Sequence, residues 1–211
     1  MESKARLGRI NNVQNLFWTP EQQIDIQNMI HELIVSTQNR AGDTHLAPMG
    51  IHQNGDELII LPFRPSTTLN NLLETGVAVF NYCDDVRVFA GCLTGRRDFP
   101  TQSASKIQGS VLECALAHSE LEIIRVEDDE TRPKLYGKVI HSETHAPFQG
   151  FNRAQYSVLE AAILVSRLNM LPMEKIQSEL DYLKIGLEKT AGEREREAWG
   201  WLMAVIEAHQ T

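Results

Sequence analysis

Short apolar runs that alternate with polar residues dominate the chain from Met29 to about residue 142. Six of these runs have the length and composition of strands: 30–37, 44–52, 57–63, 76–82, 111–126 and 134–142. The acidic stretch 127–130 separates the last two runs, as expected of a solvated hairpin loop. The pattern predicts a domain built mainly of β-strands.

Turn and helix signals lie between these strands. Asn54-Gly55 predicts a hairpin, because a type I′ turn needs positive φ at both central residues. In 66–75, three leucines recur at helical spacing behind a Ser/Thr cap, which predicts a short helix. A second short helix is predicted at 84–93, with Asp84 or Asp85 as its cap.

After Gly150 the spacing of apolar residues becomes helical. Asn152 is expected to cap a first helix that ends near Leu171, because Pro172 cannot continue it. Pro172 suits the first turn of a second helix, and Thr190-Ala191-Gly192-Glu193 has the capping-box spacing that introduces a third. The sequence thus predicts an α+β, mainly β protein in three parts: a polar leader at 1–28, a β-barrel at 29–150 and a helical subdomain at 151–211.

Charge and cysteine content narrow the class of protein. The 211-residue chain has a formal charge of −8, which disfavours broad electrostatic binding to nucleic acid or to anionic membranes. No apolar run approaches the roughly 18 residues that a membrane span requires. Cys83, Cys92 and Cys114 are widely separated and odd in number, which favours a reducing compartment over a disulfide framework. We therefore expect a cytoplasmic protein without nucleic-acid or membrane partners.

A Ser/Thr-rich loop leads into the helix predicted at 66–75. Arg64 is a permanent cation, and Ser66, Thr67 and Thr68 offer hydroxyl groups beside the free N–H groups of a helix start. A compact phosphomonoester suits this set of donors. The alternative is that Ser66 or Thr67 only caps the helix and that Arg64 pairs with a surface carboxylate.

The segment 45–50 (HLAPMG) holds a proline within a strand pattern. Pro48 confines this strand to a sheet edge or a bulge, because proline donates no ladder hydrogen bond. Ala47 and Met49 leave backbone groups and an apolar surface within reach of a flat heteroaromatic ring. The alternative is a kinked edge strand that binds nothing.

Three segments in order, Ala47-Pro48-Met49, Thr68-Leu69-Asn70-Asn71-Leu72 and Val79-Phe80-Asn81, resemble the flavin-reductase-like FMN-binding split barrels. The segment Gly150-Phe151-Asn152-Arg153-Ala154 and the helices after it narrow the resemblance to a family of split-barrel flavoproteins from archaea and one-carbon-metabolising bacteria. What this resemblance implies is a split β-barrel with a C-terminal helical extension, which binds FMN at a homodimer interface.

The same resemblance implies which residues hold the cofactor. Ala47, Pro48 and Met49 would line the flavin ring. The phosphate would lie at the turn before the helix, held by Arg64, Ser66, Thr67 and Thr68. Further candidates are Asn71, Asn81, Ser36 and Thr37. The chain has Arg64-Pro65-Ser66 where the broader reductases often place a Lys-Asp pair, which leaves the phosphate ligands open.

A few remaining polar residues are candidates for chemistry. Arg153 follows the cap Asn152, where a helix start favours an anion, although an exposed arginine is the alternative. His45 is the best histidine for a proton donor to reduced flavin or substrate, with a surface histidine as the alternative. His141 and His145 straddle a strand end and lack the shared helical face of a two-histidine metal site, so we expect no metal.

The leading hypothesis is an FMN-binding flavoprotein, an oxidoreductase whose flavin carries hydride to a small acceptor of unknown identity. Two alternatives stay open. One is a non-catalytic module that binds a flavin or a pterin, and the other is a structural dimer without a ligand.

Overall fold

A closed, six-stranded antiparallel barrel is formed within residues 30–144, in a computed structural model that describes residues 29–54 and 57–210. The strand order is β1-β2-β3-β8-β7-β4. The strands are β1 (Ile30–Gln38), β2 (Thr44–Asn54), β3 (Glu57–Ile60), β4 (Val77–Tyr82), β7 (Ala117–Glu127) and β8 (Lys134–Thr144). The expected mainly β, split-barrel fold with C-terminal helices is confirmed.

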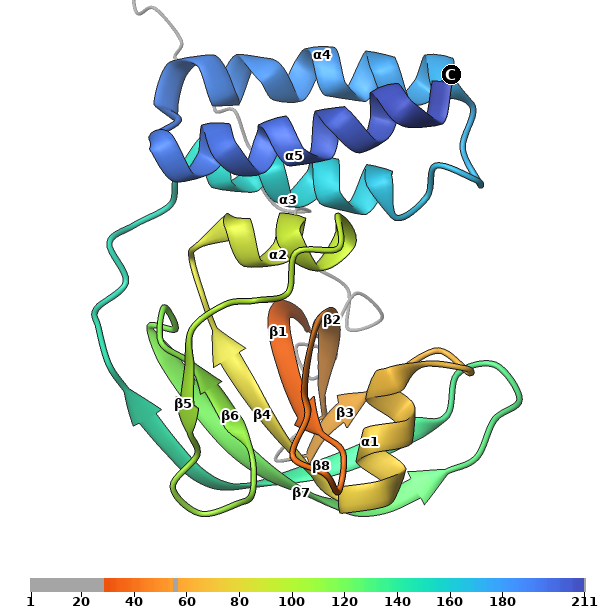
Figure 1. The fold of residues 1–211 in the computed structure, drawn as a ribbon, viewed down its shortest axis with the longest axis vertical. Coiled ribbons are helices and arrows are strands. Elements are labelled where there is room, and N and C mark those ends of the chain that lie inside the picture. Colours follow the sequence, from red (N-terminus) through yellow and green to blue (C-terminus); the bar gives the residue numbers. More distant parts are fainter. Residues whose placement is uncertain (1–28, 55–56, 211) are drawn as a thin grey trace, which may run out of the picture.

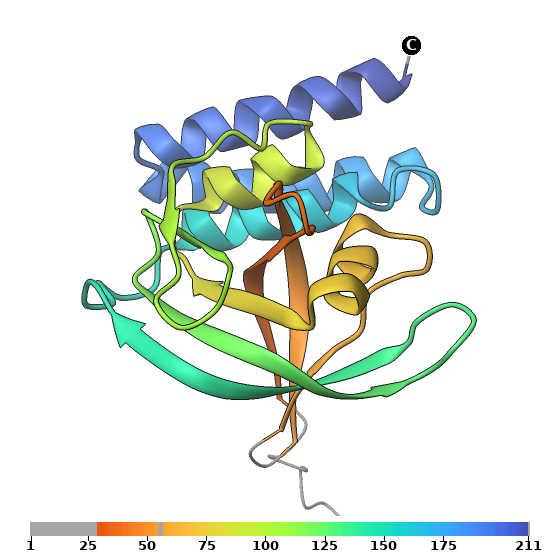
Figure 2. The same ribbon diagram turned by 60° about the horizontal axis from the view of Figure 1, so that its bottom comes forward.

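A helical layer lies over one side of this barrel (Figures 1 and 2). It consists of α3 (Arg153–Val165), α4 (Met173–Thr190) and α5 (Glu193–Gln210), and α2 (Val86–Leu93) lies between these helices and the strands. Val86 and Ala90 of α2 are buried in the same apolar cluster as Leu202 and Ile206 of α5. The helices thus cover barrel wall that would otherwise face water.

The helix α1 (Thr67–Thr75) closes the barrel interior. Inward side chains of the strands, among them Val35 and Phe80, form one buried cluster with Leu69 and Leu72 of α1. Burying each such side chain contributes about 1.5–3 kcal/mol to folding. The helix ends at Gly76, whose φ of 70° is a conformation that glycine adopts without strain.

The ladder between β2 and β3 is short, and this opens the barrel wall. β2 pairs with β1 from Thr44 to His52, but it pairs with β3 only from His52 to Asn54. Within the described part of the chain, the other edge of β2 from Thr44 to Ile51 therefore forms no ladder. This unpaired stretch is called the open edge of β2 below, and it confirms that Pro48 lies on an edge.

A two-stranded hairpin of β5 (Thr101–Ser103) and β6 (Ser110–Leu112) packs outside β1 and β4, and its loop contacts β7. Asn81 on β4 accepts the N–H of Leu112 at 2.8 Å, and its amide donates to Ser36 Oγ at 3.1 Å. The hydroxyl of Ser36 donates in turn to the carbonyl of Ser110. Buried side chains thus satisfy backbone groups that have no sheet partner there.

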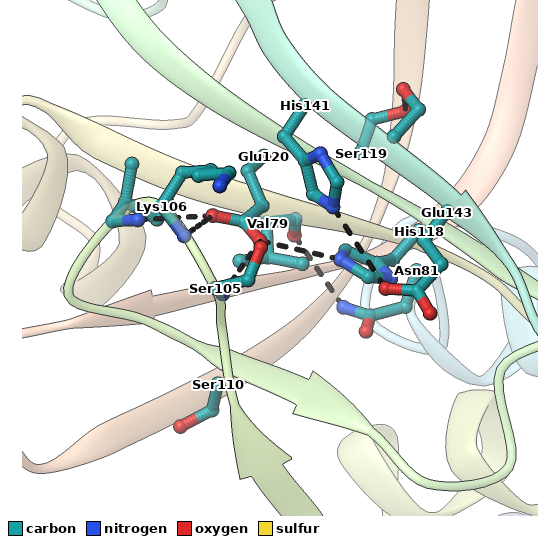
Figure 3. Close-up of polar contacts among 12 residues, drawn as sticks. Val79, Asn81, Ser105, Lys106, Ser110, His118, Ser119, Glu120, His141 and Glu143 are labelled. Atoms are coloured by element: carbon teal, nitrogen blue, oxygen red, sulfur yellow. Dashed lines mark hydrogen bonds and ion pairs between the residues drawn. The ribbon is translucent and has the colours of Figure 1, made fainter.

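Glu120 on β7 fastens the loop of the same hairpin (Figure 3). Its carboxylate is fully buried and accepts N–H groups of Ser105, Lys106 and Ile107 at 2.7–3.0 Å, together with the Ser105 hydroxyl at 2.8 Å. Burial by itself raises the pKa of Glu120, but these donors outweigh it and lower the pKa to about 2. Glu120 is therefore a buried anion at neutral pH.

Three features differ from the sequence prediction. The run 111–126 is two strands, because the chain turns between Leu112 and Ala117, and β5 was not foreseen. The first C-terminal helix ends at Val165 rather than near Leu171, where the Ser166 hydroxyl donates to the Ile163 carbonyl and the last turn tightens.

The predicted capping box at the start of α5 is also wrong. Thr190 belongs to the end of α4, where its hydroxyl donates to the Gly186 carbonyl at 2.9 Å. Glu195 instead accepts the N–H of Gly192 at 2.8 Å and caps α5. Asn152 caps α3 as expected, since its side chain accepts the N–H of Ala154 at 2.7 Å.

Two predictions fall wholly or partly outside the described residues. They are the leader at 1–28 and the turn type at Asn54-Gly55, although the antiparallel pairing of β2 with β3 confirms a hairpin there. Among the described helices, none is long and apolar enough to cross a membrane.

Replacement of Asn81 tests how strongly the hairpin is held. We expect Asn81→Ala to lower the free energy of unfolding by about 2 kcal/mol, because the buried N–H of Leu112 loses its acceptor. Urea unfolding followed by circular dichroism measures this change. The exposed Asn169→Ala serves as the control and should stay within about 0.5 kcal/mol of the parent. Equal effects of the two variants would refute the assigned role of Asn81.

Candidate functional site

The start of α1 has the features of an anion site. Ser66 is its N-cap, and the Ser66 hydroxyl oxygen accepts the N–H of Leu69 at 3.1 Å, while the Ser66 carbonyl accepts that of Asn70. Among the described residues, the N–H groups of Thr67 and Thr68 have no such acceptor. No acidic residue lies in this first turn, so the partial positive charge of the helix start is not neutralised there.

Cationic side chains lie around this helix start. The guanidinium of Arg64 is 2.8 Å from Asp128 in the β7–β8 loop, and both side chains are exposed. From the same loop, Arg132 stacks over the Phe63 ring at 4.5 Å and donates to the carbonyl of Leu61 at 3.0 Å. Arg132 was missed in the sequence, because nothing near it in the chain indicates that its loop meets the turn before α1.

The buried residues of this region connect α1 to the barrel. The side-chain amide of Asn71 donates to the hydroxyl of Thr37 on β1 at 3.1 Å. Thr37, Thr68 and Asn71 are all nearly inaccessible to solvent, whereas Thr67 is exposed. The structure therefore brings four predicted residues, Arg64, Ser66, Thr67 and Thr68, together at one helix start, with Thr37 and Asn71 behind them.

The segment Ala47–Met49 lies on the open edge of β2. Ala47 and Met49 are paired with Val35 and Leu33, so they point into the barrel, while Pro48 points to the outer face with Ile34. All three residues are half-buried. Within the described residues, backbone groups on this edge face no neighbouring strand, as expected of a strand interrupted by proline.

Ser36 and Asn81 have partners within the protein. Both are buried, and their hydrogen bonds run to each other and to the backbone of β1, β4 and β6. Within the described part of the chain, no buried side-chain nitrogen or oxygen lacks a partner. The structure thus gives these two residues a role in holding the hairpin.

Arg153 and His45 lie apart from the start of α1. Arg153 is exposed at the start of α3 and lines a cavity of about 330 Å³ with residues of α4, among them Tyr182 and Lys189. His45 Nδ1 is 3.0 Å from the guanidinium of Arg97. Burial and then Arg97 lower the pKa of His45 below its ordinary value of 6.5, which makes it a poor proton donor at neutral pH.

A separate apolar cavity of about 350 Å³ lies between the barrel and α3. Its aromatic lining residues are Phe89, Phe148, Phe151 and Tyr156, and Phe151 is fully exposed. Cys83, whose Sγ is 3.6 Å from Sγ of Cys114, lines it as well. The cavity has the size of a small-molecule site.

Histidines gather on the outer face of β7 and β8. His118, which the sequence analysis did not single out, is stacked against His145 with ring centroids 5.0 Å apart, and His141 meets it edge-on at 5.8 Å. The expectation of no metal site rested on the missing helical face of His141 and His145 and did not include His118, which strand pairing brings beside both. Sequence spacing carries no signal of that pairing.

Comparisons with known proteins agree with this fold. A crystal structure of an FMN-bound DUF447 protein from Methanosarcina mazei has a TM-score of 0.72 with 21% sequence identity, over 85% of this chain and 96% of that one. A 2-nitrobenzoate 2-nitroreductase of Pseudomonas fluorescens has a TM-score of 0.48 with 16% identity, over 56% of this chain and 66% of that one.

The flavin reductase component of a bacterial two-component tryptophan halogenase also has a TM-score of 0.48, with 15% identity, over 57% of this chain and 84% of that one. No curated protein matches the sequence significantly. Two family models match consecutive parts of the chain. The N-terminal domain of the protein of unknown function DUF447 matches residues 31–146, and the second DUF447 model matches residues 152–204. The chain therefore belongs to the DUF447 family.

Proposed function

We propose that this protein binds FMN, with the phosphate at the start of α1 and the flavin ring along the open edge of β2, and that it is an oxidoreductase. The observation that carries the proposal is that the two features adjoin. α1 packs against β1 and β2, and the hydrogen bond from Asn71 to Thr37 fixes the helix to the barrel wall.

The donors at the helix start fit a phosphate monoester. The hydroxyl groups of Ser66 and Thr67, the N–H groups of Thr67 and Thr68 and the guanidinium of Arg64 supply hydrogen bonds and positive charge. A phosphate monoester carries almost two negative charges at neutral pH. Binding it requires Arg64 to leave the exposed carboxylate of Asp128, an ion pair that contributes little in water.

The open edge of β2 fits the ring. A flavin ring needs donors and acceptors in its plane and an apolar surface against its face. Pro48 supplies a carbonyl on this edge and an apolar ring, and Ala47 and Met49, whose backbone groups pair with β1, supply apolar side chains. When bound, FMN supplies transfer of hydride or of single electrons.

Assembly and location complete the proposal. We place the protein in the cytoplasm as a homodimer, a setting suited to three cysteines that are all free. The FMN-bound state of the Methanosarcina mazei relative supports the choice of cofactor. The apolar cavity beside Phe89 is a suitable place for a small acceptor.

Removal of the phosphate donors should weaken FMN binding. Arg64→Ala and Thr67→Ala should each raise the Kd for FMN by roughly ten- to a hundred-fold, because each loses a hydrogen bond to a charged group. Quenching of flavin fluorescence measures the Kd. Arg40→Ala is the matched control, since Arg40 pairs with Glu74 near the other end of α1. Unchanged affinity in both variants would move the phosphate elsewhere.

Replacement of Asp128 should have the opposite effect. Asp128→Asn frees Arg64 and removes a negative charge near the phosphate, so we expect the Kd for FMN to fall by up to about five-fold. The gain should disappear in the background of Arg64→Ala. Weaker binding by Asp128→Asn would show that this carboxylate does not compete with the ligand.

A redox test separates an enzyme from a binding module. Anaerobic addition of NADH or NADPH to the FMN-loaded protein should bleach the flavin absorbance, and photoreduction of the same sample provides the positive control. Retention of colour with both nucleotides, but not under photoreduction, would contradict a nicotinamide-dependent reductase and favour a module that only binds flavin.

A further inference from the structure

Four side chains that commonly ligate metals form a block on one face of the β7–β8 ladder. The register pairs His118 with Glu143 and Glu120 with His141. Residues directly opposite one another, and residues two apart on one strand, point to the same face of a sheet. Figure 3 shows His118, His141 and Glu143 converging, with Glu120 beside His118.

Distances within this block fit a common ion. One ligand atom from each of His118, His141 and Glu143 lies within 4.8 Å of the other two. His141 Nε2 is already 3.8 Å from Glu143 Oε2. In a tetrahedral site with bonds of about 2.1 Å, ligand atoms are about 3.4 Å apart. Small side-chain rotations are therefore enough to bring the three groups onto one ion.

His118 is held as metal-ligating histidines usually are. Such a histidine uses one ring nitrogen for the metal while the other bonds a fixed partner. Whichever nitrogen His118 uses, the other has a partner: Nε2 is 3.4 Å from Glu120 Oε1, and Nδ1 is 2.8 Å from His145 Nε2. Glu120 is itself immobilised by the N–H groups of residues 105–107.

The charge on this face favours a cation. Glu120 and Glu143 are both carboxylates, and Glu120 is fully buried, where an anion is least shielded by water. Neutral imidazoles add lone pairs and no positive charge. A divalent ion bound to His118, His141 and Glu143 would offset this charge.

The solvent exposure of the three proposed ligand side chains increases from His118 to His141 to Glu143. His118 is 3% exposed, the side chain of His141 is 28% exposed and that of Glu143 is 55% exposed. An ion can therefore enter from solvent and keep water as a further ligand. Three protein ligands with one open position are typical of catalytic metal sites, whereas structural zinc sites are closed by four.

We propose that His118, His141 and Glu143 bind a divalent first-row transition-metal ion of the zinc type. The ion takes the place of one hydrogen-bond partner of the His118 ring, and the remaining partner, Glu120 or His145, orients it. Two imidazoles and one carboxylate suit zinc and its neighbours, whereas magnesium and calcium prefer oxygen ligands alone. The site needs no flavin, so it stands or falls independently of the function proposed above.

Metal titration of the untagged, full-length, chelator-treated protein tests this site. We expect one Zn²⁺ per chain by calorimetry, and Co²⁺ should give the visible absorption of a low-symmetry complex. His141→Ala and Glu143→Gln should each weaken Zn²⁺ binding by at least about a hundred-fold. Both residues have accessible side chains, so the fold should survive, and circular dichroism verifies this.

His31→Ala is the matched control, because His31 is an exposed strand histidine outside the block, and it should leave the affinity unchanged. Absence of stoichiometric Zn²⁺ binding by the parent protein would overturn the proposal. So would equal affinities of the parent, His141→Ala and Glu143→Gln. In either case the histidines would serve only as a hydrogen-bond network between β7 and the segment after β8.

Discussion

Three buried polar side chains, Ser36, Asn81 and Glu120, hold the segment 104–112 against the outer wall of the barrel. The hairpin to which this segment belongs has strands of only three residues, β5 and β6, so it cannot satisfy all of its own backbone groups. The barrel supplies the missing partners from β1, β4 and β7. A buried carboxylate is tolerated there because four donors replace its lost water.

Other parts of the structure depend on this attachment. Leu112 belongs to the apolar cluster that joins the barrel to α2. The hairpin therefore forms part of the contact between the barrel and the helical layer. Glu120 also contacts His118 and thus connects the loop to the histidines of β7 and β8. The proposed FMN site lies on α1 and β2, and the proposed metal site lies on β7 and β8. The strands β2, β7 and β8 belong to the same barrel.

Local patterns of the sequence predicted most helices and strands, but they could not predict which distant residues form hydrogen bonds with one another. Strand periodicity located the barrel, and the cap at Ser66 located α1, because both signals act over a few residues. Ser36 and Asn81 were predicted only as candidate FMN ligands, from the family resemblance, because the partners that they hold in the fold lie 74 and 31 residues away. Non-local pairing of this kind leaves no trace in spacing.

The helix start illustrates the same limit. For two residues the structure agrees with the alternative of a helix cap and a surface ion pair, because Ser66 caps α1 and Arg64 pairs with Asp128. An exposed ion pair contributes little in water, so Arg64 stays available to an anionic ligand. Arg132 contacts this turn from the β7–β8 loop, a position that only the fold reveals.

The open edge of β2 also bears on how the protein avoids self-association. A strand edge with free N–H and C=O groups is a template for any extended chain, and such edges promote fibre-like assembly. Pro48 lies in the middle of this edge and lacks an N–H, so it interrupts the row of donors that an added strand would need. A proline at this position thus also protects the exposed edge against strand addition and aggregation.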